Sequence, residues 1–503
     1  MAILKDLLKK ANVTGTNLVD FDIECTGLSH NSLKCSEGDV FICIPGEHVD
    51  GHDFICTAVQ NGAKIIVCER VTPWIGEHPE VAYITVQNTR LAAAHMWNEL
   101  CGRPSERLMV VAVTGTNGKT STTYFLREIF KYAGYKTGVI GTVKCLIGDK
   151  EAVLSDSDTS NVNSMTTPSP ERLYPMLRRM ADEGVEIVFM EASSHSLSQY
   201  RLDPIKFIAG VFTGLTQDHL DFHGSMEEYY LAKRRLFSLC STALINVEGV
   251  YSRRLCNEII TPCQTYGVDT RHADFFACNV TGDASRGISY TFGDRCGSVR
   301  IECPTAGEFM VQNTLAAAST ARLFGIKKEV IANALSSCGQ IPGRMERVML
   351  DGADFDVFID YAHTPDALER VLKSLLAFKK PSGRLIAVFG CGGDRDKGKR
   401  AIMGRIATTL ANLTVITSDN SRSENPRAII CDILRGAAEG AEYKVIERRE
   451  KAIRWVIENH REGDVILLAG KGHEDYEIDE NGKRPFSEKD IIFNSFAGFN
   501  KQT

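Results

Sequence analysis

The residues best suited to chemistry lie in a glycine-rich segment that reads Gly-Thr-Asn-Gly-Lys-Thr-Ser from Gly115 to Ser121. Glycines let backbone N–H groups approach an anion closely, Lys119 supplies a mobile cation, and the hydroxyl of Thr120 or Ser121 can reach Mg²⁺. The strict phosphate-loop pattern is not met, because Val113 stands where its first glycine should be. A tight turn with a structural lysine is the simpler alternative. The order of residue types nevertheless favours a nucleotide-phosphate site.

The flanking sequence supplies the elements that would position this loop. An apolar, β-branched run at 108–113 is too short for a helix and predicts a buried strand. The following segment, 122–132, spaces Phe125, Ile129 and Phe130 on one helical face. Strand, loop and helix in this order predict that an anion would meet the positive end of the helix dipole.

Two further strands of the same region end in residues that suit Mg²⁺. Apolar runs at 186–190 and 209–213 lead into Glu191 and into a loop that contains His219. Because parallel strands present ligands at their carboxyl ends, both side chains are expected beside the glycine-rich loop. A histidine in a loop is more often a hydrogen-bonded structural residue, which is the alternative for His219.

The rest of this middle region alternates strand and helix patterns, which predicts a largely parallel sheet. Ser225 begins a capping-box sequence, Ser-Met-Glu-Glu, that predicts a helix carrying Lys233. Alternation of residue types between Phe275 and Cys303 predicts an antiparallel meander, and a helical segment at 312–323 closes the region.

Strand and helix patterns alternate most clearly after residue 341, which predicts a doubly wound sheet. The strand-like runs are 355–359, 385–389, 413–417, 443–446 and 465–469. Four of the five lead directly into polar clusters, which begin at Asp360, Gly390, Ser418 and Gly470. Any one cluster could be a solvated loop. Four at one edge of a sheet, with Arg, Lys, Asp and Glu mixed, predict a charged, zwitterionic ligand.

Length and composition set the broad class of the protein. A chain of 503 residues should hold about three domains. Linker-like segments at 102–105 and 341–344 divide it into 1–104, 105–340 and 341–503, and strand-like runs at 40–44 and 64–68 predict a small α/β unit for the first.

Charge and cysteine content indicate which partners to expect. The net charge of −6 creates no field that would attract nucleic acid, and no apolar run is long enough to cross a membrane. Sixteen cysteines without a C-x-x-C pair predict reduced, mostly buried thiols. We therefore expect a cytoplasmic protein that binds small molecules, neither nucleic acid nor membrane, and that is a monomer.

Taken together, the motifs resemble the Mur ligase family over essentially the whole chain. The order and spacing of nine motifs carry the resemblance: GTNGKT at Gly115, TTP at Thr166, MEASSH at Met190, DHLDFHG at Asp218, AKRRLF at Ala232, PGRME at Pro342, DYAHTP at Asp360, GCGGDRDKGKR at Gly390 and GKGHE at Gly470. The resemblance implies three α/β domains: a small N-terminal domain for a UDP-sugar, a central P-loop domain for ATP, and a C-terminal Rossmann-like domain that delivers an amino acid.

The likeness is strongest to the family members that add the third residue of the stem peptide. It implies an ATP-dependent amide-bond ligase that adds meso-2,6-diaminopimelate to UDP-N-acetylmuramoyl-L-alanyl-D-glutamate in peptidoglycan precursor synthesis. ATP would phosphorylate the D-Glu side-chain carboxylate, and the amine would then attack the acyl phosphate. Cations must cancel charge in that phosphoryl transfer, a role implied for Lys119, Mg²⁺ and Arg344.

The resemblance also implies a role for individual residues, position by position. ATP would contact Gly115, Thr116, Asn117, Gly118, Lys119, Thr120, Ser121, Asn313, Arg344 and Asp360. Catalysis would use Lys119, Glu191, His219, Lys233 and Arg344, and Mg²⁺ would be held by Thr120, Glu191, His219 and Lys233 as a carbamate formed with CO₂. Without the resemblance, Lys233 would be taken for a surface lysine of a basic helix.

Three groups of residues match substrate positions of the family. The UDP end would meet Ser32, Glu47, His48 and Val49, and the muramoyl-peptide would meet Thr166, Thr167, Ser193, Gln199 and Arg201. The incoming amino acid would meet Arg395, Asp419, Asn420, Ser421, Arg422, Gly470 and Glu474. The sequence departs from the family pattern at Leu33, at Met310 and at Ser421, where an Arg, an Asn and a Pro are usual.

Arg422 decides the expected amino acid. Diaminopimelate and L-lysine differ by one carboxylate, which a planar guanidinium can bind bidentately, and lysine-adding relatives typically lack this Arg. The simpler alternative is a surface ion pair between Arg422 and Glu424. Other functions considered are a lysine-adding ligase, a P-loop regulatory ATPase, a non-catalytic binding protein, and a folylpolyglutamate-type ligase, which would begin near its P-loop.

Overall fold

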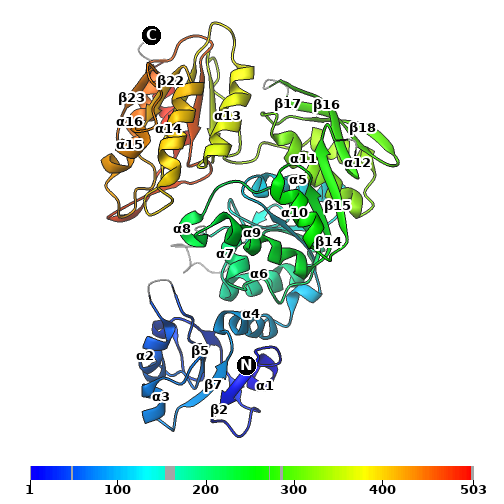
Figure 1. The fold of residues 1–503 in the computed structure, drawn as a ribbon, viewed down its shortest axis with the longest axis vertical. Coiled ribbons are helices and arrows are strands. Elements are labelled where there is room, and N and C mark those ends of the chain that lie inside the picture. The colour runs from blue at the N-terminus through cyan, green and yellow to red at the C-terminus, as the bar shows by residue number, and fades with distance from the viewer. Residues whose placement is uncertain (1, 47–48, 153–164, 271, 284–286, 500–503) are drawn as a thin grey trace.

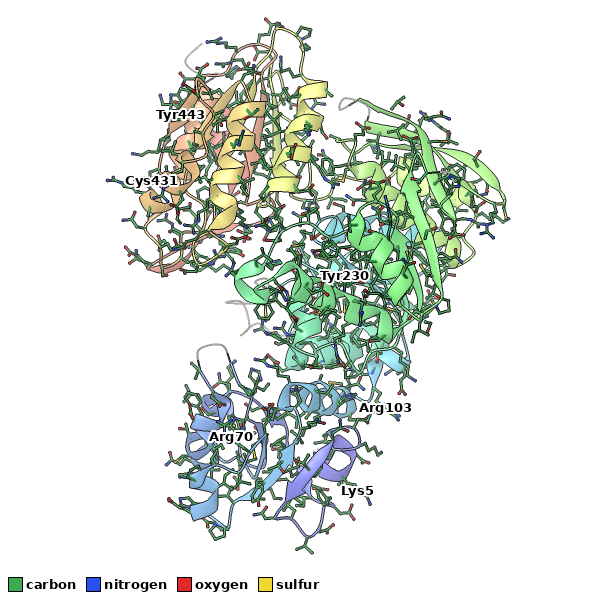
Figure 2. The ribbon with its side chains drawn as sticks, in the orientation of Figure 1. Lys5, Arg70, Arg103, Tyr230, Cys431 and Tyr443 are labelled. Carbon is green, nitrogen blue, oxygen red and sulfur yellow. The ribbon has the colours of Figure 1, made fainter. Side chains whose placement is uncertain are left out.

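A computed structural model describes residues 2–46, 49–152, 165–270, 272–283 and 287–499. Three units follow one another along the long axis of the molecule, and each has its own sheet (Figure 1). Figure 2 shows Arg103 between the first two units, where the sequence predicts a linker. The predicted α/β class is confirmed. No helix in the described part of the chain is long and apolar enough to cross a membrane.

The N-terminal unit is a five-stranded sheet with helices around it, as predicted for a small α/β unit. Its strand order is β2 (Val13–Thr16), β7 (Ala82–Val86), β6 (Ile65–Cys68), β5 (Val40–Ile42) and β4 (Leu28–Ser29), and all neighbours except β2 and β7 are parallel. Apolar strands such as β6 are buried along their whole length, as parallel strands covered on both faces require. The remaining elements are β1 (Ala2–Ile3), β3 (Glu24–Cys25), α1 (Leu4–Leu7), α2 (Ile55–Gln60), α3 (Pro73–Glu77) and α4 (Thr89–Leu100).

The central unit holds an eleven-stranded sheet, and the prediction of a largely parallel sheet is confirmed. Seven neighbouring strands run parallel: β9 (Thr137–Ile140), β12 (Ile187–Glu191), β8 (Met109–Thr114), β13 (Phe207–Phe212), β14 (Cys240–Asn246), β15 (Cys263–Val268) and β16 (Phe275–Asp283). The antiparallel strands are β10 (Leu146–Ile147) and β11 (Lys150–Glu151) at one edge, and β17 (Gly287–Asp294) and β18 (Gly297–Cys303) in the predicted meander at the other.

Helices cover both faces of this sheet because successive strand residues point to opposite sides. Val111 and Val113 of β8 pack with the first helix layer, whereas Val110 and Ala112 pack with the second. The first layer is α5 (Lys119–Tyr132), α11 (Met310–Leu323) and α12 (Lys328–Ser336). The second includes α6 (Pro170–Asp182), α9 (Met226–Arg234) and α10 (Val250–Glu258), with the short α7 (Ser194–Ser198) and α8 (Leu220–His223) nearby.

The C-terminal unit is the predicted doubly wound sheet. Its order is β19 (Glu346–Val348), β20 (Asp356–Asp360), β24 (Val465–Ala469), β21 (Leu385–Phe389), β22 (Leu413–Ile416) and β23 (Tyr443–Val445), and only β19 is antiparallel. One face carries α13 (Pro365–Phe378), α14 (Gly398–Leu410) and α15 (Pro426–Leu434), and the other α16 (Arg449–Glu458) and α17 (Glu488–Phe499). The hairpin of β25 (Tyr476–Asp479) and β26 (Gly482–Pro485) was not predicted.

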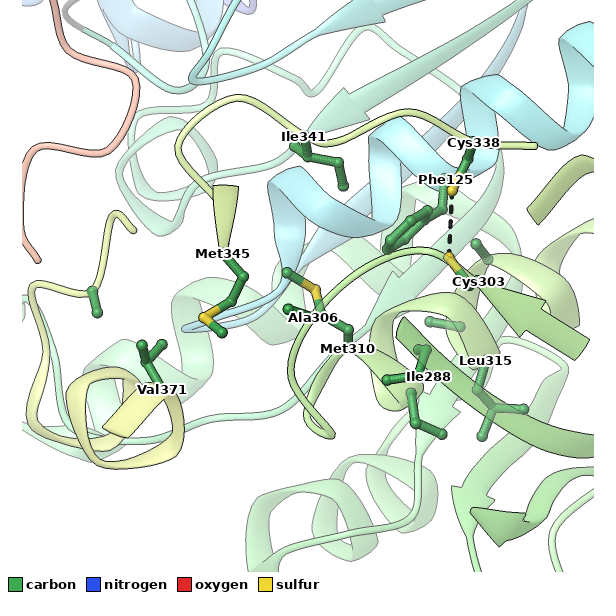
Figure 3. Packing of buried hydrophobic residues seen from close by; sticks show 14 of the residues in the cluster. Phe125, Ile288, Cys303, Ala306, Met310, Leu315, Cys338, Ile341, Met345 and Val371 are labelled. Atoms are coloured by element: carbon green, nitrogen blue, oxygen red, sulfur yellow. Dashed lines mark hydrogen bonds between the residues drawn. The ribbon is translucent and has the colours of Figure 1, made fainter. Parts of the chain in front are cut away.

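The C-terminal unit docks on the central unit through a shared apolar core. Ile341 and Met345, from the connecting segment, and Val371 of α13 belong to the same buried cluster as Met310 and Phe125 of the central unit (Figure 3). This packing brings the carboxyl ends of the two parallel sheets to face a common space.

Candidate active site

The glycine-rich loop joins the end of β8 to the start of α5, as predicted. Gly115 and Gly118 have φ angles of 151° and 84°. A Cβ at Gly115 would lie 1.9 Å from Oγ1 of Thr213, and one at Gly118 would lie 2.4 Å from Oδ1 of Asn313. Both positions therefore require glycine, for backbone conformation and for close approach. The same contact places Asn313 beside the loop.

Lys119 is the first residue of α5, and its side chain folds back over the loop. Its Nζ donates hydrogen bonds of 2.9 Å to the carbonyl oxygens of Gly115 and Thr116. Burial lowers the pKa of Lys119. The chain thus holds a cation against neutral carbonyl groups, at the helix end where an anion would bind.

A cavity of about 340 Å³ lies between this loop and the C-terminal unit. Every residue expected to contact ATP lines it except Gly115: Thr116, Asn117, Gly118, Lys119, Thr120, Ser121, Asn313, Arg344 and Asp360. Nδ2 of Asn117 donates to Oδ2 of Asp366 at 2.9 Å across the two units. Burial raises the pKa of Asp360 to about 6, although Arg344 opposes that rise.

At the side of the cavity, Glu191 accepts hydrogen bonds from the hydroxyl groups of two threonines. Its carboxylate accepts from Oγ1 of Thr120 at 3.0 Å and from N and Oγ1 of Thr142 at 2.8 and 3.0 Å. Nη2 of Arg344, from the connecting segment, donates to Oγ1 of Thr120 at 3.0 Å. These oxygen donors fit Mg²⁺, which binds through one or two carboxylates and substrate phosphates rather than a closed protein cage. Consistent with this, no group of three His, Cys, Asp or Glu side chains in the described residues could hold a metal alone.

His219 lies in the same space, in a left-handed conformation with φ of 54°. Its Nε2 is 3.3 Å from Oδ2 of Asp218, a buried carboxylate that also lies 3.9 Å from Nε2 of His363 and from Nζ of Lys399. Burial would raise the pKa of Asp218, but His219, His363 and Lys399 lower it. Asp218, His363 and Lys399 each lie within a quoted motif, but no local pattern marks them as site residues. The contacts of Asp218 with His363 and Lys399 join two separate units.

The simpler alternative, in which Lys233 is a surface lysine, is wrong. Its side chain, on α9, is 1% exposed, and its Nζ donates to the carbonyl oxygen of Gly115 at 2.9 Å. Lys119 uses the same carbonyl oxygen. Burial, and then the charge of Lys119, lower the pKa of Lys233 well below its ordinary value. This environment favours the neutral amine over the ammonium ion.

The five residues expected to hold the muramoyl-peptide form one hydrogen-bonded network that begins at Glu191. Oγ1 of Thr167 donates to the Glu191 carbonyl at 2.7 Å and accepts from N of Ser193 at 3.0 Å. Arg201 donates to the Thr167 carbonyl at 2.8 Å and to the side chain of Gln199. Thr166 joins the network by donating its hydroxyl to Oγ1 of Thr142 at 3.0 Å, since that oxygen already donates to Glu191, and it lines the cavity.

Ser32 and Val49, two of the residues expected at the UDP end, lie in the N-terminal unit and do not line the cavity. Ser32 is buried at the start of a 3₁₀ turn, and its carbonyl accepts from Nδ2 of Asn61 at 2.9 Å. Val49 is 55% exposed. Glu47 and His48 lie outside the described residues.

The polar clusters of the C-terminal unit form a second site, which we call the C-terminal pocket: Arg395, Asp419, Asn420, Ser421, Arg422, Gly470 and Glu474. At its centre, Nδ2 of Asn420 donates to Oε2 of Glu474 at 2.8 Å. A Cβ at Gly470 would lie 2.5 Å from Oδ2 of Asp419, so this approach requires glycine. Burial and Asp419 raise the pKa of Glu474. Ser421 is buried and Arg395 is exposed.

Lys471 is buried next to the C-terminal pocket and bonds to its residues, and the sequence did not indicate it. Its fully buried Nζ donates to Oδ1 of Asn420 at 2.9 Å and to the Tyr476 carbonyl at 2.8 Å, and it lies 3.9 Å from Asp419 and 3.7 Å from Glu474. Burial alone would raise the pKa of Asp419, but Lys471 lowers it. In the sequence, Lys471 is one more polar residue after a strand, so nothing marks it as buried.

Arg422 faces the pocket without a carboxylate partner among the described residues. Its Nη1 donates to the carbonyl oxygens of Gly393 at 2.8 Å and Asn420 at 3.3 Å. The alternative of an ion pair with Glu424 is wrong, because Glu424 binds Arg400 at 2.8 Å instead. Burial and the charge of Arg395 lower the pKa of Arg422. Both guanidinium groups of the pocket therefore have only carbonyl acceptors among the described residues, because Arg395 donates to the Asp394 carbonyl oxygen at 2.9 Å.

The two sites are joined by the segment 470–474. Nε2 of His473 lies 3.1 Å from the carbonyl oxygen of Thr142, whose N and Oγ1 hold Glu191. A Cβ at Gly343 would lie 2.2 Å from N of His473, so the connecting segment packs directly on this strand end. One short segment thus contributes Glu474 to the pocket and a contact to the cavity.

Three family models match consecutive parts of the chain. The Mur ligase family catalytic domain matches residues 24–102, the Mur ligase middle domain matches 113–321, and the Mur ligase glutamate ligase domain matches 343–472.

Whole proteins give the same result. The chain is 40% identical over 474 residues to a UDP-N-acetylmuramoyl-L-alanyl-D-glutamate–2,6-diaminopimelate ligase of Clostridium acetobutylicum, covering 94% of this chain and 95% of that one. It is 38% identical over 492 residues to the ligase of the same name from Clostridium tetani, covering 97% and 98%. A solved structure with this name superposes with a TM-score of 0.67 at 28% identity, over 99% of both chains.

Proposed function

The chain belongs to the Mur ligase family, and we propose that it joins meso-2,6-diaminopimelate to UDP-N-acetylmuramoyl-L-alanyl-D-glutamate at the expense of ATP. The observation that carries the proposal is identity of 38 to 40% along nearly the whole chain to ligases named for this reaction. The product is a peptidoglycan precursor, which places the enzyme in cell-wall biogenesis and, through it, in cell shape and division. We expect it to act as a cytoplasmic monomer.

The reaction needs an activated carboxylate, because a carboxylate is a poor electrophile. An oxygen of the D-Glu side chain attacks the γ-phosphorus of ATP, and ADP leaves. The amine of diaminopimelate then attacks the acyl phosphate, and the tetrahedral intermediate loses phosphate. Phosphoryl transfer between anions depends on placed cations, and we assign that work to Lys119 and Arg344 at the cavity.

We assign the ATP site to the loop from Gly115 to Ser121 together with Asn313, Arg344 and Asp360. Support comes from the single cavity that nearly all of these residues line. Thr120 and Glu191, with His219 nearby, would hold Mg²⁺, which when bound supplies further positive charge to the phosphates. The division of labour follows the domain boundaries proposed from sequence: 1–104 for the UDP-sugar, 105–340 for ATP and 341–503 for the amino acid.

We propose that Lys233 carries a carbamate. A neutral amine is the form that attacks CO₂: the nitrogen forms a bond to carbon, one proton leaves, and the side chain becomes an anion. The burial and lowered pKa of Lys233 supply that neutral amine. The carbamate nitrogen keeps one hydrogen, which can still donate to the Gly115 carbonyl oxygen. The new oxygens would serve as further ligands for Mg²⁺.

The other substrates are assigned by the two remaining sets of residues. The network of Thr166, Thr167, Ser193, Gln199 and Arg201 would hold the muramoyl-peptide next to Glu191, with Ser32, Glu47, His48 and Val49 toward its UDP end. The C-terminal pocket would take the amino acid, with Arg422 binding the far carboxylate of diaminopimelate.

The decisive experiment measures phosphate release from ATP with UDP-N-acetylmuramoyl-L-alanyl-D-glutamate and a panel of amino acids. We expect release to depend on both the nucleotide substrate and meso-diaminopimelate. A preference for L-lysine at equal concentration would assign the lysine-adding reaction instead. Release that ignores the amino acid would contradict ligase activity altogether.

A further inference from the structure

Two pairs of cysteine thiols in the central unit lie close together, and neither belongs to the site described above. The Sγ atoms of Cys256 and Cys263 are 3.9 Å apart, and those of Cys303 and Cys338 are 3.3 Å apart. All four are free thiols. The pairs differ in access: Cys256 and Cys263 are partly exposed, whereas Cys303 and Cys338 are 1% and 5% exposed. Figure 3 shows the second pair inside the core.

The partly exposed pair lies at a short surface loop between a helix and a strand. Cys256 is near the end of α10 and Cys263 begins β15, and the loop between them carries a fully exposed Ile260. A disulfide needs the two sulfur atoms to come within about 2.05 Å. Side chains that already face each other across a short surface loop can reach that distance by rotation about χ1 and a small loop adjustment.

The two pairs also differ in how readily they ionise. A thiol that donates to its neighbour stabilises the neighbour as thiolate. The Cys263 thiol lowers the pKa of Cys256 to about 7, against the effect of burial, and the pKa of Cys263 rises in turn. Asp274 adds to that rise. In the buried pair, the Cys338 thiol and burial raise the pKa of Cys303 well above its ordinary value. Cys256 is therefore partly thiolate at neutral pH, whereas its environment holds Cys303 in the thiol form.

We propose that Cys256 and Cys263 form a reversible thiol–disulfide site that reacts with hydroperoxides, and that Cys303 and Cys338 do not. An accessible thiolate beside a second thiol is the arrangement of redox-sensing cysteines. The thiolate sulfur attacks a peroxide oxygen, the O–O bond breaks, and a sulfenic acid and an alkoxide or hydroxide result, which takes up a proton. The second sulfur then attacks the sulfenic sulfur, and the S–O bond breaks as water leaves. The disulfide fastens the end of α10 to β15.

The bond would form in an element that touches the nucleotide cavity. Gly249, which precedes the first turn of α10, lines the cavity together with Glu248 and with Asn246 at the end of β14. The site itself does not depend on which ligand the cavity binds, so it stands apart from the proposed ligase activity.

Peptide mapping of the full chain tests the proposal. The reduced protein is treated briefly with hydrogen peroxide, denatured, alkylated and digested. We expect a cross-linked peptide joining Cys256 to Cys263 that dithiothreitol reverses, with Cys303 and Cys338 alkylated. Two exposed cysteines report that the peroxide acted: Cys296, between β17 and β18 of the central unit, and Cys431, on α15 of the C-terminal unit (Figure 2). Oxidation of these two without the cross-link, or cross-linking of Cys303 to Cys338 first, would overturn the proposal.

The rate of Cys256 alkylation by iodoacetamide at pH 7 gives a second measurement. Cys263→Ala removes the thiol that stabilises the thiolate, so the pKa should return from about 7 toward 9.0. The thiolate fraction would fall from about one half to about 1%, but the more basic thiolate is about tenfold more nucleophilic, so we expect roughly fivefold slower reaction. The matched variant Cys338→Ala should leave the rate unchanged. An unchanged rate in Cys263→Ala would contradict activation by the pair.

Discussion

The two parallel sheets present very different charges at their carboxyl ends. At the nucleotide edge, which we define as the Gly115–Ser121 loop with Glu191 and Lys233, two lysines share one carbonyl oxygen and neither is in an ion pair within the described residues. At the amino-acid edge, the C-terminal pocket, the buried Lys471 is balanced by Asp419 and Glu474, and the guanidinium groups of Arg395 and Arg422 have no carboxylate partner among the described residues.

The difference indicates the charge of each ligand. A buried cation that meets only carbonyl groups is costly until an anion arrives, so the nucleotide edge is suited to phosphates and to a carbamate on Lys233. The amino-acid edge offers two carboxylates together with the exposed Arg395 and the partly buried Arg422, which suits a zwitterion with an extra carboxylate. The predictions below test each side of this contrast.

The largest effect is expected from Lys119→Ala. Removing one placed charge from the site of phosphoryl transfer should lower ATP turnover by at least about 10³-fold, because transition-state charge goes uncompensated. The melting temperature should change little, since the side chain, at the start of α5, packs over the glycine-rich loop rather than in the apolar core. Phosphate release measures ATP turnover, and a thermal melt measures the melting temperature. Lys131→Ala, on the same helix but exposed and paired with Asp149, is the control. Turnover like that of the wild type would remove the phosphate-site assignment.

Lys233→Ala should lower turnover by about 10² to 10³-fold, because an anionic oxygen ligand is lost beside the phosphates. Acetate or another short carboxylic acid should restore part of the activity by supplying that oxygen. An independent readout is the carbamate ¹³C signal of wild-type protein equilibrated with ¹³CO₂, which the variant should lack.

The neighbouring residue offers a matched control for Lys233. Arg234→Ala, on the same helix as Lys233, removes an exposed cation that pairs with Glu258 of α10, and it should leave turnover nearly unchanged. A fully active Lys233→Ala enzyme would exclude the carbamate.

Arg422→Ala tests the amino-acid edge. Loss of a charge-assisted, bidentate contact should cost about 2 to 3 kcal/mol, which raises the KM for meso-diaminopimelate by roughly 30 to 200-fold. The KM for L-lysine should change much less, so the variant should prefer meso-diaminopimelate over L-lysine less strongly than the wild type does. Competition assays measure it. Arg427→Ala, an exposed residue paired with Glu447, is the control. Unchanged use of diaminopimelate in Arg422→Ala would contradict the assignment.

Much of this contrast could be predicted from the sequence, and the missing parts share a cause. Apolar runs bounded by glycine and polar residues identified the parallel strands, and strand ends identified Glu191, His219 and Arg422. The burial of Lys233 and Lys471, and the contact of Asp218 with His363, depend on segments far apart in the chain, which no local pattern records. The β25–β26 hairpin was missed because its first strand is only four residues long, too short for its alternation to stand out, and its second strand, Gly482–Pro485, has no apolar side chain except that of proline.

The smallest expected effect concerns the pH dependence of folding stability, to which two aspartates of the C-terminal unit contribute differently. Burial raises the pKa of Asp360, at the nucleotide cavity, to about 6, whereas Lys471 lowers that of Asp419 at the amino-acid edge. An unfolded Asp360 would titrate near 3.8. Between about pH 4 and 6 the unfolded chain therefore releases this proton while the folded chain keeps it, so stability falls as pH rises through that window and then levels off.

Asp360→Asn keeps an acceptor for the Met345 N–H but cannot ionise. Relative to wild type it should be unchanged at pH 4 and more stable by about 1 to 3 kcal/mol at pH 7. Denaturant unfolding at the two pH values measures this, and a difference that is equal at both would show that ionisation of Asp360 is not its source.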